Sequence, residues 1–147
     1  MRLRVVVGCG LAILTCRSPA SPSVVLTGAW DYSFSAVSPV VCPGPFPHPQ
    51  GCGGVGDLRL DHVGSALSGT HTEVFGCQDC RMAADGGGSG PLKNAEVSGK
   101  TFAFTTTICR FTASVPDGMV DTVHGVVSCA PWVGLEVQGT WRMTRVR

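Results

Sequence analysis

Apolar and polar residues alternate along much of the chain, and this pattern predicts β-strands. Alternation with a period of two runs through Asp57–Val63, Thr101–Thr105 and Leu135–Thr144, as is typical of strands with one buried face. Thr and Val, which suit half-buried pleated surfaces, are frequent in these segments. Beyond the N-terminal residues, no stretch of useful length has the 3.6-residue period of an amphipathic helix. We therefore expect an all-β domain.

A short unit recurs in these segments: an apolar residue, a polar residue and then glycine. Its occurrences are Leu26-Thr27-Gly28, Leu67-Ser68-Gly69, Val97-Ser98-Gly99, Val123-His124-Gly125 and Val137-Gln138-Gly139. Glycine inside a strand marks a bulge or a bend, and repeated glycines help a sheet to curve toward closure. The pattern predicts an antiparallel up-and-down β-barrel, or a barrel-like sandwich, of about seven or eight strands.

Two segments depart from the alternation and are expected to be loops. Residues 39–56 are rich in Pro and Gly, and Pro cannot donate a hydrogen bond to a neighbouring strand. Residues 77–93 contain the run Asp85-Gly86-Gly87-Gly88-Ser89-Gly90-Pro91. These glycines do not form a phosphate-binding loop, because neither a helix nor a Lys-Ser/Thr pair follows them. We expect a single domain over residues 21–147 that carries both loops.

The first residues have the pattern of an export signal. Arg2 and Arg4 precede an uncharged run over residues 5–15. Such a run is too short to cross a bilayer, which needs about 20 apolar residues. Residues 1–20 are therefore expected to be a signal peptide with its processing site.

Two cleavage sites are compatible with this signal. Cleavage before Cys16 would match a bacterial lipobox, Ile13-Leu14-Thr15-Cys16, and the Cys16 thiol would then carry a lipid. Cleavage after Ala20 would follow the small residues of Ser18-Pro19-Ala20 and give an ordinary secreted protein. In both cases we expect an extracytoplasmic protein of the bacterial envelope. Cleavage before Cys16 would attach it to the membrane through a lipid anchor, and cleavage after Ala20 would leave it without one.

Composition narrows the possible functions. The 147 residues include only 14% charged residues and have a formal net charge of +1, so the chain offers no basic surface for nucleic acid. The hydrophobic share of 44% is too high for a disordered chain. We therefore expect a folded protein that does not bind nucleic acid.

Eight cysteines in so short a chain indicate an oxidising compartment. Cys9 leaves with the signal peptide, and Cys16 is lipidated or removed. The six that remain are expected to form disulfides: Cys42, Cys52, Cys77, Cys80, Cys109 and Cys129. Six cysteines allow 15 connectivities, all of which stay open. Proximity in the sequence favours Cys42–Cys52, Cys77–Cys80 and Cys109–Cys129.

Candidate chemistry is sparse. Cys77-Gln78-Asp79-Cys80 has the CxxC spacing of redox and zinc sites. A redox site would need a helix after this motif, and none is predicted. A zinc site would need four ligands, and apart from His62 or His71 no second pair of ligands has matching spacing. A structural disulfide is therefore favoured, and no metal or cofactor is expected. Asp61 and Glu73 are expected on a solvated strand face. The chain lacks the G-x-S-x-G and H-E-x-x-H motifs. We expect no catalytic residues, and a secreted enzyme is the least favoured function.

The first and last predicted strands carry a pair of related motifs. Gly28-Ala29-Trp30 opens the first strand, and Gly139-Thr140-Trp141-Arg142 lies in the last. A Gly-x-Trp on the first strand with a basic residue on the last resembles the lipocalin and avidin group (calycins) of small β-barrels. Residues 56–70 look like the second hairpin of avidin-type barrels, although His71 stands where that hairpin would offer Tyr, so biotin binding is not expected. The resemblance covers roughly residues 24–145.

This resemblance implies packing at one end of a barrel and a binding or structural role. Trp30 would plug the closed end beside Trp141, and Arg142 would cover Trp30, with Arg145 as the alternative. Barrels of about eight strands either fill their interior or hold one small ligand, and an apolar ligand is the expected type. The alternative is an inhibitor-like interaction module that displays the Pro-rich loop 42–52, because rigid loops lose little entropy on binding.

Overall fold

The structure, a computed structural model, describes residues 26–45, 47–114 and 118–147. The described residues form nine antiparallel strands in one sheet and no helix. The strands are β1 (Gly28–Cys42), β2 (His48–Val63), β3 (Ala66–Gln78), β4 (Ala83–Pro91), β5 (Lys93–Ser98), β6 (Thr101–Thr105), β7 (Cys109–Ser114), β8 (Thr122–Trp132) and β9 (Leu135–Arg145). The all-β prediction is confirmed, with slightly more strands than expected. The predicted signal peptide, Cys9, Cys16 and Ala20 lie outside the described residues.

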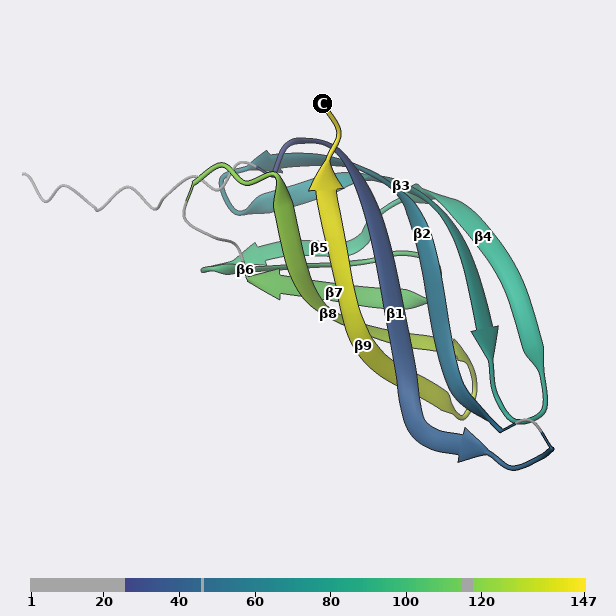
Figure 1. Ribbon diagram of the computed structural model, residues 1–147. Helices are drawn as coiled ribbons and strands as arrows, with labels where there is room; N and C mark the ends of the chain where they lie inside the picture. The colour runs from purple at the N-terminus through teal and green to yellow at the C-terminus, as the bar shows by residue number, and fades with distance from the viewer. Residues whose placement is uncertain (1–25, 46, 115–117) are drawn as a thin grey trace, which may run out of the picture.

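The sheet has an up-and-down order that nearly closes into a barrel (Figure 1). Its order is β4-β3-β2-β1-β9-β8-β7-β6-β5. The first and last strands therefore pair in the middle of the sheet, and β4 and β5, which are consecutive in the chain, are its two edges. We call the opening between these edges the seam.

The interior of the barrel is filled by aromatic side chains. Tyr32 and Phe34 of β1 point inward and are nearly fully buried. They belong to a continuous group of rings with Phe102, Phe104, Phe111 and Trp141, in which neighbouring ring centroids lie 5.1–6.4 Å apart. Ring pairs at such distances contribute about 0.5–1.5 kcal/mol each beyond their buried area. This ring group forms the centre of the hydrophobic core.

Glycines on β2 make room for the rings of β1. Gly54 lies opposite Phe34, and Gly56 lies opposite Tyr32. A Cβ atom built on either glycine would stand 2.7 Å from the ring of its partner, which is closer than van der Waals contact allows. These glycines therefore lie in a strand because they permit close packing.

The predicted loop over residues 39–56 is wrong. β1 continues to Cys42 and β2 begins at His48, so only residues 43–47 connect them. Pro39 is accommodated because the register between β1 and β2 shifts between Val37 and Val41, and Pro is tolerated at such irregularities.

The predicted loop over residues 77–93 is also wrong for most of its length, since Ala83–Pro91 is strand β4. Two of its glycines are in tight contact with neighbouring side chains. A Cβ atom on Gly86 would stand 2.7 Å from the ring of Phe75, and one on Gly88 would collide with the hydroxyl of Thr107. Glycine occupies these two positions because neighbouring side chains leave no room for a Cβ atom.

All six cysteines predicted to form disulfides do so: the bridges are Cys42–Cys80, Cys52–Cys77 and Cys109–Cys129. The third pairing is confirmed, and the Cys42–Cys52 and Cys77–Cys80 pairings are wrong. Cys52 and Cys77 lie opposite each other on β2 and β3, so strand register decides the pairing where sequence proximity does not. Two bridges therefore join the long strands β1–β3 near the end at which β1 stops.

Candidate functional site

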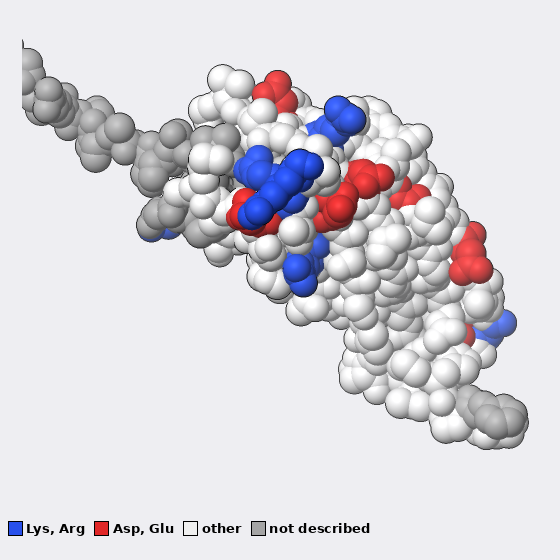
Figure 2. All heavy atoms as spheres, turned by 45° about the horizontal axis from the view of Figure 1, so that its top comes forward, with Lys and Arg blue, Asp and Glu red and all other residues white. Residues whose placement is uncertain are grey.

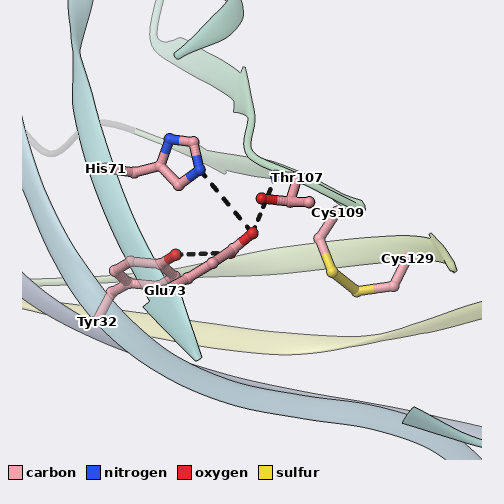
Figure 3. Close-up of polar contacts among 6 residues, drawn as sticks. All are labelled: Tyr32, His71, Glu73, Thr107, Cys109 and Cys129. Carbon is pink, nitrogen blue, oxygen red and sulfur yellow. Dashed lines mark hydrogen bonds and ion pairs between the residues drawn. A yellow bond between two sulfur atoms is a disulfide. The ribbon is translucent and has the colours of Figure 1, made fainter. Parts of the chain in front are cut away.

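Four residues meet at a buried polar site inside the barrel (Figure 3). Tyr32 comes from β1, His71 and Glu73 from β3, and Thr107 from the connection between β6 and β7. We call them the Glu73 cluster. The Glu73 side chain is fully buried, so the prediction that it lies on a solvated face is wrong. Asp61, which was predicted on the same kind of face, is exposed.

A missing side chain on β2 brings two members of the Glu73 cluster together. Gly56 lies between Tyr32 and Glu73 in the strand register. Because glycine has no side chain to separate them, the Tyr32 hydroxyl reaches across β2 and donates a hydrogen bond to Glu73 Oε2 at 2.9 Å. A hydrogen bond to a charged acceptor is about twice as strong as one between neutral groups.

The second hydrogen bond of Glu73 crosses the seam. The Thr107 backbone N–H donates to Glu73 Oε1 at 3.0 Å. Glu73 lies on β3, beside the edge strand β4, whereas Thr107 follows β6, beside the edge strand β5. One buried carboxylate therefore links the two sides of the barrel at a place where no backbone ladder does so among the described strands.

His71 completes the site without a close hydrogen bond. Its Nε2 is 3.9 Å from Glu73 Oε1, which is too long for a hydrogen bond. Neither ring nitrogen has a hydrogen-bond partner among the described residues, and the same holds for the hydroxyl of buried Thr106. If His71 takes up a proton, it forms an ion pair with Glu73.

The chemistry of this site is that of a sealed interior. Burial raises the pKa of Tyr32 far above its ordinary value, and the negative charge of Glu73 and the hydrogen bond to it add to this effect. The side chains of His71 and Glu73 are 6% and 0% exposed, although Tyr32 and Glu73 also border a cleft on the outer face of the sheet. The arrangement is suited to holding strands together.

Arg145, and not Arg142, covers Trp30 at the end of the barrel. Its guanidinium carbon lies 4.2 Å from the centroid of the Trp30 ring, and its Nη1 donates to the carbonyl of Thr27 at 2.8 Å. The placement of Arg142 was wrong because the two arginines are three residues apart, and an odd separation in a strand puts them on opposite faces. Trp141 is buried within the central ring group.

Arg142 instead lines a shallow cleft on the outer face of β9, β1, β2 and β3, with a volume of about 560 Å³. Asp31 and Asp57 lie opposite each other in it, and the Thr72 hydroxyl donates to Asp57 at 3.0 Å. Figure 2 shows acidic and basic side chains intermixed toward the end of the molecule where the C-terminus lies, with a broad uncharged surface beyond them. The visible surface therefore has no strong field of one sign.

The described residues contain no group of three or more His, Cys, Asp and Glu side chains placed to hold a metal ion. Cys77 and Cys80 belong to two different disulfides. Within the same part of the chain, no helix has the length and apolar character needed to cross a membrane.

Comparison of the chain with protein-family models, with curated proteins and with solved structures found no match.

Proposed function

We propose that the protein is an exported β-barrel of the bacterial cell envelope, lipid-anchored through Cys16, with a structural and non-catalytic role. The observation that supports a structural role most is the ring group that fills the interior. Three disulfides are compatible with an extracytoplasmic location. They also stabilise a small barrel whose edge strands β4 and β5 share no ladder among the described strands, since each bridge typically contributes about 2–4 kcal/mol.

The same observation favours this role over carriage of a small apolar ligand. Phe104 and Phe111 stack at 5.1 Å, and both rings meet Trp141 edge-on at 5.5 and 5.3 Å. All three side chains are almost fully buried. Closely packed interiors leave few voids larger than a water molecule, so a ligand would have to displace these rings.

A binding experiment with a built-in control tests the structural role. The mature protein should show no saturable binding of a benzene-sized apolar ligand by NMR titration. Phe104→Ala should bind it, because an apolar cavity left by a lost ring stays dry and accepts such molecules. Saturable binding by the unmodified protein, at an affinity equal to that of Phe104→Ala, would rule out a filled interior.

A mass measurement tests the anchor separately. Intact mass of the protein from a membrane fraction should show a lipid adduct on Cys16 as the first residue. Cys16→Ala should remove the adduct and release the protein from membranes. A mature chain that begins after Ala20 and carries no lipid would replace the anchored form with a secreted one.

A second candidate function is display of the connection between β1 and β2, residues 43–47, to a protein partner. The Cys42–Cys80 bridge fixes the end of β1 beside this connection, and the Cys52–Cys77 bridge fixes β2. A connection on a rigid base loses little entropy on binding. Replacing residues 43–47 with a Gly-Ser linker of equal length should abolish capture of a partner if this function holds, and should leave the barrel folded.

A further inference from the structure

The edge strand β4 pairs with its neighbour without interruption, and its one backbone irregularity is a positive φ of 154° at Gly90, next to its last residue. It pairs with β3 over nine consecutive residue pairs, from Thr70–Pro91 to Gln78–Ala83, without a register shift. Among the described strands β3 is its only ladder partner, and β4 forms the outer margin of the sheet in Figure 1. A regular edge strand presents a row of unpaired N–H and C=O groups that can template another strand.

The usual protection of an edge is present on β5 and nearly missing on β4. In β5 the register shifts between Lys93 and Glu96, and Asn94 has a positive φ of 48°. Bulges and Lys side chains are common devices that prevent edge-to-edge pairing. In β4 the single charged residue is Asp85, and Pro91 stands at the very end. On the side away from β3, the backbone between Asp85 and Pro91 pairs with no other strand among the described residues.

We propose that β4 pairs with β4 of a second copy of this chain, in an antiparallel arrangement about a two-fold axis at Gly87. In an antiparallel pair, the N–H and C=O groups of two facing residues point either both toward the opposite strand or both away from it. The two-fold axis must therefore pass through a residue and cannot pass between two residues. An axis at Gly87 places all nine residues of β4 opposite a residue of the second copy. Such a contact is isologous and closes as a dimer.

The charge of Asp85 disfavours an axis at Asp85 itself, whereas an axis at Gly87 keeps the two carboxylates apart. With the axis at Gly87, Asp85 of each copy lies opposite Ser89 of the other. With the axis at Asp85, the two carboxylates would face each other, which is destabilising. Asp85, Gly87 and Ser89 are exposed and share the outer face, so Ser89 provides a neutral hydrogen-bonding partner for the carboxylate.

Sedimentation analysis of the mature protein in a density-matched non-ionic detergent tests the dimer. The unmodified protein should show a concentration-dependent monomer–dimer equilibrium. Ser89→Asp should raise the dimer Kd about tenfold, because it creates two like-charge pairs across the axis, and added salt should reduce this effect. Ser89→Lys should lower the Kd, because each Lys then faces Asp85 of the other copy.

A charge reversal makes the test specific for this register. The double variant Asp85→Lys, Ser89→Asp restores opposite charges across the axis and should dimerise more tightly than Ser89→Asp alone. Ser35→Asp is the matched control, because Ser35 is exposed on the central strand β1 and should leave the Kd unchanged. The melting temperature of each variant shows that it is folded.

A protein that stays monomeric at every concentration overturns the proposal. So does a dimer that responds equally to Ser89→Asp and Ser35→Asp, or one that the double variant fails to restore, because the contact would then lie elsewhere on the surface.

Discussion

Replacing Glu73 by Gln removes a buried charge while keeping the shape of the side chain. The carboxylate accepts hydrogen bonds from the Tyr32 hydroxyl at 2.9 Å and from the Thr107 N–H at 3.0 Å. The Gln amide has one oxygen, so one of these two buried donors loses its acceptor. A buried donor left unsatisfied costs about 1–3 kcal/mol, whereas loss of the charge relieves part of its desolvation cost. We expect Glu73→Gln to lower the free energy of unfolding by about 1–3 kcal/mol.

Glu73→Ala should cost more, about 3–5 kcal/mol, because both donors then lack an acceptor and the side chain leaves a void. The assay is guanidinium denaturation under oxidising conditions, followed by tryptophan fluorescence. Glu136→Gln is the matched control. Glu136 is exposed on β9, and among the described residues it accepts one long hydrogen bond of 3.4 Å from the Ser128 hydroxyl. Its loss should therefore change stability by less than about 0.5 kcal/mol.

A double-mutant cycle isolates the contact that Glu73 makes with Tyr32. Tyr32→Phe removes the hydroxyl and retains the ring. If the hydrogen bond acts as described, Tyr32→Phe and Glu73→Gln together should cost less than the sum of their separate effects, with a coupling energy of about 0.5–3 kcal/mol. Equal denaturation midpoints for Glu73→Gln, Glu136→Gln and the unmodified protein would refute a stabilising role for the buried carboxylate.

Three further predictions concern other parts of the molecule. Tyr32 is the only tyrosine of the chain, and its pKa lies above the ordinary 10.0 in the folded state. As pH rises, the unfolded chain therefore loses this proton before the folded chain does, so the free energy of unfolding should fall by up to about 1.4 kcal/mol per pH unit above pH 10. Tyrosinate absorbance follows the loss of the proton, and Tyr32→Phe should remove this dependence of stability on pH. Gly139→Ala should destabilise by about 1–3 kcal/mol in thermal unfolding, because its Cβ would collide with the backbone of β1, whereas Gly44→Ala, with open space around it, should be neutral. Replacing Cys42 and Cys80 together by Ser should lower the free energy of unfolding by about 3 kcal/mol in denaturant titration. The loss is limited because the Cys52–Cys77 bridge stays intact, so Cys42–Cys80 closes only the short segments 42–52 and 77–80.

The alternation of apolar and polar residues predicts the fold well, because burial of one face is the main constraint on a strand. It predicts poorly where a polar residue points inward. Leu67, His71, Glu73 and Cys77 are separated by even numbers of residues and share the inner face of β3. That parity is a signal for burial of Glu73, yet an isolated carboxylate in the core is costly and therefore unexpected until its two donors are seen.

Long-range pairing is the other feature that local patterns do not contain. The acceptor of Thr107 lies 34 residues away in the chain, and the Cys42–Cys80 bridge spans 38 residues. Both depend on the register between strands, which is set by the packing of whole faces. By contrast, Cys109 and Cys129 lie opposite each other on the adjacent strands β7 and β8, so their proximity in the sequence is enough to predict this bridge.

Closure of the barrel by side chains also explains why one edge stays available. A barrel closed by a complete ladder has no edge. Here the Thr107 N–H donates to Glu73, and the Thr107 side chain lies against Gly88 on the inner face of β4. The contact therefore supports β4 from inside the barrel and leaves its outer edge without a partner strand among the described residues. A seam closed by one carboxylate and a regular, unpaired edge strand are two consequences of the same arrangement.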